Sequence, residues 1–411
     1  MNEARSVEVC IAGGGPAGMV LGYLLGRCGI STLVLESGGD FDRDFRGDTL
    51  HAGVLEIFQS IGLAGEILEL PHHKIRSLSA GGTTLVNFKI LDTDFPFVTM
   101  MAQSIFLSFL AEKSREFPSY KIEMDASVRE LVQNEAGAVK GVRYRKNGEM
   151  VEVAAGLVVA CDGRGSHLRK EAGLELEPVT DLLEVLWFRL PRDESDQQYG
   201  RSGAITGGRL PFIVLERTDH YQIACVIKPG TFSEIRKEGI CAFHEEIGRA
   251  APQLESRAVE TLKTWKDIAF LHVEGGRLAK WHGPGLLLIG DAAHVMTPVG
   301  GVGINYAIWD AVETANVIVP VLKNGEKIDE NSLGEIQRRR EPATRRMQTI
   351  QRVAGRKLLE IVSSELGQPF QIPRILRWML TFPGIRSIPP KLIALGGKRT
   401  RCEVKSYFQK G

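Results

Sequence analysis

Two short apolar runs flank a glycine-rich turn at the start of the chain. Residues 7–12 are apolar except for Glu8, and residues 32–35 form a second run that ends at Glu36. Between them, apolar side chains recur at helical spacing from Ala17 until the chain reaches Gly29. The pattern therefore predicts a strand, a glycine turn, a helix and a second strand, which together form one βαβ unit.

Later apolar runs also end at turns that contain glycine. Residues 157–161 run into Asp162-Gly163, and residues 286–289 run into Gly290-Asp291. Because ligands bind where the strands of an α/β sheet end, both turns are expected at one binding edge. The same patterns predict a helix over residues 103–117, strands over 128–132 and 141–145, and a hairpin turn at Asn147-Gly148.

The middle of the chain has a different pattern. Four segments, at residues 183–190, 203–206, 212–217 and 221–227, predict antiparallel strands. They indicate a β-rich domain over 71–96 and 181–264, inserted into an α/β domain over 1–70, 97–180 and 265–330. Residues 331–411 are expected to be helical and basic, with breaks at Pro342, Pro373, Pro383, Pro389 and Pro390.

The composition is that of an ordinary folded protein. Of the 411 residues, 43% are hydrophobic and 25% are charged, which argues against a mostly disordered or fibrous chain. The formal net charge is +1, so the chain as a whole is not expected to bind nucleic acid. The charge is uneven, however, since residues 331–411 hold 17 Lys and Arg against 5 Asp and Glu.

This basic region raises the hypothesis of peripheral membrane contact. Around residues 372–382, Trp378 and aliphatic side chains are interspersed with Arg374 and Arg377, a pattern that can lie on an anionic lipid surface. The alternative is that the apolar side chains pack on the rest of the protein and the arginines are solvated. No run of about 18 apolar residues occurs, so no membrane span is expected.

The six cysteines point to neither a metal nor a disulfide. They show no Cys-x-x-Cys spacing and no accompanying histidine cluster, so no metal site is expected. Cys10 and Cys161 lie in apolar runs, where buried reduced thiols are typical. Reduced thiols fit a reducing compartment, and the N-terminus does not read as a signal peptide, so a cytoplasmic protein is expected.

The first turn has the spacing of a dinucleotide-binding site. Gly13 permits the tight turn after the strand, Gly15 lets the backbone approach a pyrophosphate, and Gly18 allows close packing of the helix. Glu36 ends the second strand, where a carboxylate can accept hydrogen bonds from ribose hydroxyls. Since its charge would repel a 2′-phosphate, NADP is not expected at this turn.

Three motifs together resemble a known family. The GxGxxG turn at 13–18 is followed by a DGxxSxxR motif at 162–169 and by a GDAAH motif at 290–294 that continues into a glycine run at 298–305. In this order they resemble the flavoprotein monooxygenases typified by para-hydroxybenzoate hydroxylase, over residues 7–320. The resemblance implies an α/β fold with a Rossmann-like FAD-binding domain, an inserted antiparallel β-sheet substrate domain and a helical C-terminal region.

The resemblance also assigns residues to the adenosine and phosphate end of FAD. The pyrophosphate would lie on Gly13, Gly15, Pro16, Ala17 and Gly18. The adenosine would lie near Glu36, near Ser37, which stands where the family often has Arg or Lys, and near the backbone of Val128. Arg46 resembles an arginine near the FAD phosphates, and Asp162 and Gly163 would hold FAD and, transiently, NAD(P)H.

The flavin end has its own set of implied residues. Gln103 resembles a residue at the flavin chain, and Asp291 would hold a ribityl hydroxyl. Pro298, Gly301, Gly303, Ile304 and Asn305 would surround the isoalloxazine ring and the reacting oxygen. His51 would line the substrate pocket.

The implied reaction is aromatic hydroxylation. NAD(P)H would bind transiently and reduce non-covalently bound FAD, and O2 would then form a C4a-hydroperoxyflavin that hydroxylates a phenol, quinol or polyketide-like aromatic. The protein would hold the flavin, exclude water and orient the small aromatic or apolar substrate. Two alternatives stay open at this point: an FAD-dependent reductase or desaturase of a prenyl or lipid substrate, and a non-enzymatic flavin-binding redox sensor. The sequence does not indicate the oligomeric state.

Overall fold

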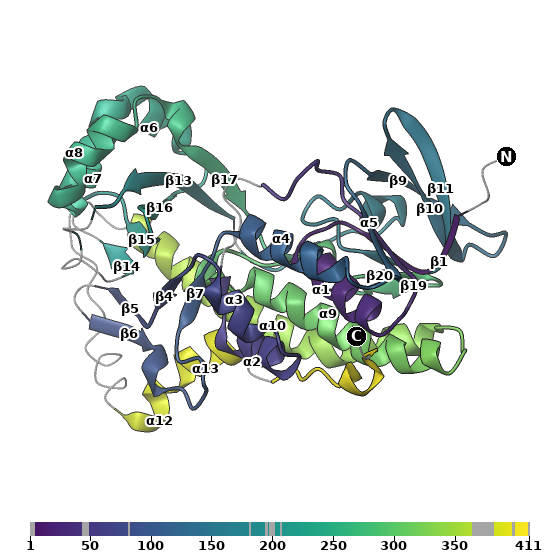
Figure 1. The fold of residues 1–411 in the computed structure, drawn as a ribbon. Helices are drawn as coiled ribbons and strands as arrows, with labels where there is room; N and C mark the ends of the chain where they lie inside the picture. Colours follow the sequence, from purple (N-terminus) through teal and green to yellow (C-terminus); the bar gives the residue numbers. More distant parts are fainter. Residues whose placement is uncertain are drawn as a thin grey trace.

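The computed structural model describes residues 5–42, 49–80, 83–180, 182–193, 196, 202–205, 208–363, 382–396 and 399–409. Two β-sheets lie toward opposite ends of the molecule, and long helices run along one side between them (Figure 1). Within these ranges no helix combines the length and the hydropathy that a membrane span requires.

The first sheet contains the predicted βαβ unit. Five parallel strands follow the order β20-β11-β1-β2-β8. Ala12 pairs with Ala160 and with Leu35, and Ala160 pairs with Leu288, so the carboxyl ends of these strands meet at one edge. The strands are β1 (Arg5–Ala12), β2 (Thr32–Leu35), β8 (Tyr120–Glu123), β11 (Glu149–Ala160) and β20 (Leu286–Leu288).

Side chains from β1 enter two different cores. Val9 and Ile11 share one core with α1 (Pro16–Arg27), whereas Cys10 and Ala12 belong to the core on the other face. The helix α4 (Gln103–Ser114) packs against α1. The first half of β11 pairs with β10 (Val139–Lys146), which pairs with β9 (Ser127–Gln133). The predicted turn before β11 is confirmed, with Asn147 and Gly148 both at positive φ.

The second sheet has seven strands in the order β17-β13-β16-β15-β14-β5-β6. On β13, Leu186 and Phe188 pack under α6, α7 and α8, which cover one face (Figure 1), while Val185 and Trp187 point to the other face. Pairing of β17 with β13 carries this sheet past residue 264, into the range expected for the α/β domain. The elements are β5 (Ser77–Ala80), β6 (Thr83–Asn87), β13 (Leu183–Pro191), β14 (Gly203–Ile205), β15 (Phe212–Glu216), β16 (His220–Ile227), β17 (Ala269–Val273), α6 (Phe232–Glu238), α7 (Ile240–Ala250) and α8 (Pro252–Thr261).

The remaining strands and helices outside the C-terminal region are short. One three-stranded sheet has the order β3-β7-β4, another has the order β12-β18-β21, and β19 extends the first sheet beside β20. The bounds are β3 (Thr49–Leu50), β4 (His73–Ile75), β7 (Val98–Met100), β12 (Glu177–Pro178), β18 (Gly276–Arg277), β19 (His282–Gly283), β21 (His294–Val295), α2 (Ala52–Ser60), α3 (Ala64–Glu69), α5 (His167–Glu171), η1 (Phe88–Ile90), η3 (Trp265–Asp267), η4 (Gly290–Ala292), η5 (Val299–Gly301) and η6 (Val404–Tyr407).

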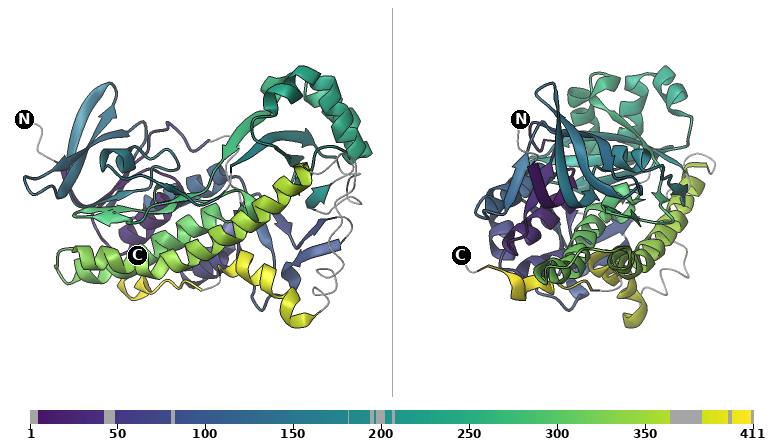
Figure 2. Two further views of the ribbon diagram at one scale, coloured as in Figure 1. Left: turned by 180° about the vertical axis from the view of Figure 1, so that it is seen from behind. Right: turned by 90° about the vertical axis from the view of Figure 1, so that its right-hand side faces the viewer.

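Two long helices form most of the C-terminal region. α9 (Gly303–Lys323) packs against α1, and α10 (Glu330–Ser363) packs along α9 and contacts both β19 and β16 (Figure 2). α12 (Pro383–Arg386) and α13 (Ile388–Leu395) follow, and their prolines stand in the first helical turn, where no N–H is needed.

One expected break is wrong, because α10 continues through Pro342. A proline inside a helix removes one backbone hydrogen bond and costs about 3 kcal/mol. On either side of it, Gln337 donates to the Ala279 carbonyl and Gln348 to the Gly276 carbonyl, so tertiary contacts hold both halves of the helix in line. The expected break at Pro373 lies outside the described residues.

Candidate active site

The GxGxxG turn is as tight as its spacing predicts. A Cβ on Gly13, which has φ +105°, would lie 2.4 Å from the Cys161 carbonyl oxygen, and a Cβ on Gly18 would lie 2.0 Å from the Gly13 oxygen. Pro16 and Ala17 open α1, and within the described chain no side chain caps this helix start. The first N–H groups of α1 are therefore available to an anion such as a pyrophosphate.

Glu36 lies beside this turn at the end of β2. The residue is 2% exposed, and its carboxylate accepts hydrogen bonds from the Gly14 N–H at 2.6 Å and the Gly38 N–H at 2.8 Å. The Ser37 hydroxyl donates to the same carboxylate at 3.3 Å. The Glu36 carbonyl accepts from Ala126, two residues before Val128, so the two predicted adenosine contacts lie close in space.

The DG motif forms a loop braced from within. Asp162 accepts from the Ser166 hydroxyl at 2.5 Å and from the Leu168 N–H at 3.0 Å. Arg169, the last residue of the motif, donates to the Ala292 carbonyl at 3.0 Å and to the Arg164 carbonyl at 2.9 Å. Arg169 therefore joins the DG loop to the GD motif, which brings Asp162 and Gly163 next to Asp291.

Asp291 lies just after β20, at the edge of the sheet where the parallel strands end. It is half-buried in η4, and its Oδ2 lies 4.0 Å from Nε of Arg164. A carboxylate in this position can accept a hydrogen bond from a polyol hydroxyl.

The glycine run bends back on itself before α9. Gly300 has φ +82° and Gly301 has φ +61°, a region that side-chain-bearing residues rarely enter. Pro298 and Gly300 are exposed although residues 292–297 are buried. Since α9 begins at Gly303 with no side-chain cap from any described residue, its first N–H groups can face a ligand.

Asn305 ties this loop to β3. Its Nδ2 donates to the Thr49 carbonyl at 2.9 Å and to the Gly301 carbonyl at 3.3 Å, and its Oδ1 accepts from the His51 N–H at 2.8 Å. The Thr49 hydroxyl also donates to the Gly301 carbonyl. Asn305 thus acts on the backbone of the loop, and its neighbour Ile304 is buried at the start of α9. The predicted contacts of both residues with the flavin stay predictions.

A fully buried ionic cluster lies beneath the GD motif. Asp310 on α9 contacts Nε2 of His294 at 2.6 Å and Nε of Arg340 at 2.7 Å, and it accepts from the Gly290 N–H at 3.0 Å. Burial raises the pKa of Asp310, but the charges and hydrogen bonds of His294 and Arg340 outweigh it and hold this pKa below its usual value. The hydrogen bond between His294 and Asp310 helps to fix the turn that presents Asp291.

His51 lies at the start of α2, against the C-terminal segment. It is fully buried, its Nδ1 lies 2.8 Å from the Ile393 carbonyl of α13, and burial lowers its pKa to about 4. The imidazole is therefore neutral at physiological pH and packs between α2 and the C-terminal segment. Its place in the substrate pocket stays a prediction.

The other predicted residues are only partly placed. Gln103 opens α4 as expected and is buried. Arg46 lies outside the described residues. Sequence reasoning missed Thr49 and Arg340, and it gave Arg169 no role beyond membership of the motif.

The residues at this edge fit FAD. Tight glycines, uncapped helix starts at α1 and α9 and the carboxylates of Glu36 and Asp291 match a pyrophosphate and two sets of sugar hydroxyls. A family model described as an FAD binding domain matches residues 6–349.

The chain belongs to the FAD-dependent aromatic monooxygenases. It is 31% identical over 365 residues to 6-methylpretetramide 4-monooxygenase of Streptomyces rimosus, which covers 87% of this chain and 85% of the relative. It is 23% identical over 339 residues to para-nitrophenol 4-monooxygenase of Pseudomonas sp. (strain WBC-3), covering 79% of this chain and 81% of that one.

Solved structures share the fold of this monooxygenase. P. aeruginosa PqsL in complex with 2-aminobenzoylacetate has a TM-score of 0.73 at 18% identity and covers 87% of this chain and 98% of its own. The p-nitrophenol 4-monooxygenase PnpA from Pseudomonas putida has a TM-score of 0.72 at 21% identity, with 96% and 95% coverage. The Rossmann-like fold is thus confirmed.

The protein is an oxidoreductase that uses FAD, NAD(P)H and O2 to hydroxylate an aromatic compound. The alternative of a prenyl or lipid reductase and that of a flavin-binding sensor are not favoured, because the curated relatives are named as monooxygenases of aromatic compounds.

Proposed function

We propose that FAD lies along the edge where the parallel strands end. The adenosine lies at Glu36, the pyrophosphate at the start of α1, the ribityl chain at Asp291, and the isoalloxazine ring over residues 298–303. The exposed surface of Pro298 and Gly300 and the uncapped start of α9 support the last placement.

In this arrangement the bound FAD supplies the activation of O2 and the transfer of one oxygen atom. The chain itself binds and orients the cofactor and the substrate. Asn305 and Thr49 fix the backbone of the loop under the ring, Arg169 holds the DG and GD loops together, and N–H groups at the start of α9 favour negative charge on the ring. The second sheet closes the other side and keeps water from the reacting atoms.

We further propose that the substrate is a fused-ring phenol of the polyketide type. The observation that carries this proposal is the 31% identity to 6-methylpretetramide 4-monooxygenase across most of both chains. A single-ring phenol is the competing class, because other relatives are named for nitrophenol and pentachlorophenol.

The side chains on the inner face of the second sheet favour the proposal of a large aromatic substrate. We use this name for the face opposite α6–α8, formed by Trp187, Ile213, Leu215, Gln222 and Ala224. Leu215 packs on the core of the first sheet, whereas Trp187 and Ala224 belong to a separate small cluster. Gln222, which is 2% exposed, stands between the two apolar areas.

Two buried N–H donors on this face have no acceptor in the described part of the chain. They are Nε1 of Trp187 and Nε2 of Gln222. The strand register places Gln222 directly opposite Arg189 and therefore diagonal to Trp187. A buried donor without a partner costs about 1–3 kcal/mol, and a phenol or ketone oxygen of the substrate would remove that cost.

The test is a substrate panel with two variants. Fused-ring polyketide phenols and single-ring phenols are compared by NAD(P)H oxidation and product mass. Trp187→Phe and Gln222→Met should raise KM for the fused-ring substrate about tenfold, because each removes one donor. Trp265→Phe, a change on the helix-covered side of the sheet, should leave KM unchanged. Hydroxylation of single-ring phenols alone would refute the proposed class.

We also propose a cytoplasmic protein without stable membrane contact. Of the six cysteines five are buried, and burial raises the pKa of the Cys10 thiol to about 12, which fits reduced, unreactive thiols. On α10, Arg338, Arg339 and Arg345 pair with glutamates, which supports a packed helix. The stretch around Trp378 lies outside the described residues, so cosedimentation with anionic and neutral vesicles is the test. Stronger binding to the anionic vesicles would contradict the proposal.

A further inference from the structure

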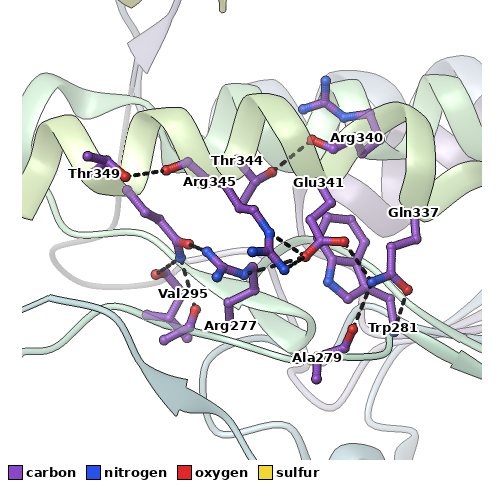
Figure 3. A network of polar contacts seen from close by, with 12 residues as sticks. Arg277, Ala279, Trp281, Val295, Gln337, Arg340, Glu341, Thr344, Arg345 and Thr349 are labelled. Atoms are coloured by element: carbon purple, nitrogen blue, oxygen red, sulfur yellow. Dashed lines mark hydrogen bonds and ion pairs between the residues drawn. The ribbon is translucent and has the colours of Figure 1, made fainter.

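The helix α10 runs beside the chain segment that carries the GD motif and the glycine run. Its inner side faces η5, and through Gln348 it also contacts β18 and β21. Figure 3 shows part of this side, with Gln337 pointing to Ala279 and Trp281 and Glu341 pointing to Arg277.

One glutamine on α10 holds the loop that leads into the glycine run. Gln351 is 1% exposed. Its Nε2 donates to the Thr297 carbonyl at 2.8 Å and to the Val299 carbonyl at 2.9 Å, and its Oε1 accepts from the Thr297 N–H at 3.1 Å. One side chain therefore uses three hydrogen bonds to fix the backbone on both sides of Pro298.

The held loop has few bonds of its own. Within the described chain its internal backbone bond runs from the Gly301 N–H to the Pro298 carbonyl at 3.0 Å. Gly300 and Gly301, both at positive φ, leave the unfolded backbone more freedom than other residues would. The loop shape is therefore set from outside, by Asn305 and Thr49 on one side and by Gln351 on the other.

We propose that Gln351 is a positioning residue that makes α10 part of the flavin site. It holds the loop at 297–301 in the shape that accepts the isoalloxazine ring, an inference that rests on the proposed placement of the ring. Because a preformed loop loses less freedom on binding, Gln351 raises the affinity for FAD. By linkage, bound FAD must stabilise the docking of α10 to the same extent.

The same helix offers a matched control. Gln348 is also a glutamine, is also 1% exposed, and also donates to two backbone carbonyls, those of Gly276 and Val295. Its partners lie in the strands β18 and β21, outside the loop at 297–301. Replacing either glutamine by Met removes buried hydrogen bonds from the same helix, but only one replacement frees the loop.

The first experiment compares Gln351→Met with Gln348→Met. For each apoprotein, the FAD dissociation constant is measured by flavin fluorescence, the visible flavin spectrum is recorded, and the Tm without FAD is determined. Gln351→Met should raise the dissociation constant at least about tenfold, the equivalent of one or two hydrogen bonds, and should shift the flavin bands. Gln348→Met should lower Tm by a similar amount with little change in FAD affinity.

A conservative variant and a second measurement extend the test. Gln351→Glu keeps an acceptor for the Thr297 N–H but donates nothing to the two carbonyls, so its affinity should be no better than that of Gln351→Met. In the wild-type protein, FAD should slow hydrogen exchange in residues 345–355 of α10. This measurement needs no variant, so it decides the matter even if Gln351→Met does not fold.

The outcomes separate the inference from the proposed function. If the wild type binds FAD but both Met variants lose the same amount of affinity for FAD, Gln351 has no positioning role. The same conclusion follows if FAD does not change the rate of hydrogen exchange in residues 345–355 of α10. If the wild type binds no FAD, the proposed function itself fails. Tight binding of FAD by Gln351→Met with an unchanged spectrum would also overturn the inference.

Discussion

Replacing Arg340 by Met removes the guanidinium that pairs with Asp310 in the middle of the fold. The two side chains are 2% and 0% exposed, and Nε lies 2.7 Å from Oδ1. Met fills the space of the aliphatic part of Arg340, but it also loses the cation–π contacts with Tyr306 and Trp309, whose rings lie within 6 Å of the guanidinium. The change therefore leaves Asp310 with His294 and the Gly290 N–H but without its permanent positive partner.

The expected loss is large because both groups are buried. Removing one partner of a buried ion pair costs about 3–5 kcal/mol. In a domain of 150–250 residues, each kcal/mol lowers Tm by about 2–4 °C, so Tm should fall by about 6–20 °C. Arg339→Met is the matched control on the same helix. Arg339 pairs with Glu335 at 2.9 Å and Glu313 at 3.3 Å but is 33% exposed, and exposed pairs contribute about 0–1 kcal/mol.

Thermal unfolding of the apoproteins, followed by circular dichroism, gives the answer. The double variant Arg340→Met with Asp310→Asn removes the uncompensated charge and should recover part of the lost Tm. Equal losses for Arg340→Met and Arg339→Met would refute the reasoning, because burial would then not govern the cost. No recovery in the double variant would show that packing, and not charge, is lost.

Three further predictions concern the site. Asp291→Ala should weaken FAD binding by about 1.5–3 kcal/mol, measured by flavin fluorescence, because it removes a charged acceptor for a ribityl hydroxyl. Gly301→Val should impair turnover more than Tm, because its Cβ would lie 3.0 Å from Oγ1 of Thr49 at φ +61°. The pKa of His51 falls to about 4 on folding, so the unfolded chain binds its proton more readily. The neutral imidazole therefore does not lower the free energy of unfolding above about pH 6.5, and this free energy should fall by roughly 3 kcal/mol as the pH is lowered to 4. In denaturant titrations, His51→Asn should make this pH dependence weaker.

The parts of the fold that the sequence predicted are those set by nearby residues. The βαβ unit depends on the run of 7–12, the turn at 13–18 and Glu36, all within one stretch, and the structure confirms each. The hairpin at Asn147-Gly148 is likewise local. Side-chain period and turn chemistry act over a few residues, so a single sequence carries them.

The glycine run shows where this local information ends. Its composition predicts a backbone open to a ligand, but the contacts that shape it come from Thr49, 252 positions away along the chain, and from Gln351. Neither residue has a distinctive neighbourhood, since a threonine before Leu50 and a glutamine in a polar helix are ordinary. Such contacts depend on how the helices pack and not on any local pattern.

The basic stretch of α10 shows the same limit for charge. The excess of Lys and Arg over residues 331–411 suggested a solvated or lipid-facing surface, yet the arginines near residue 340 differ sharply in their partners. Arg338 stays at the surface beside Glu335, while Arg340, two residues on, is buried against Asp310 of α9. A helix turns by about 100° per residue, so neighbouring charges face opposite sides, and only the packing of α9 decides which one is buried. Charge composition therefore identifies a basic region, but it does not distinguish a membrane contact from a buried ion pair. The described part of α10 contains such a buried pair, between Arg340 and Asp310.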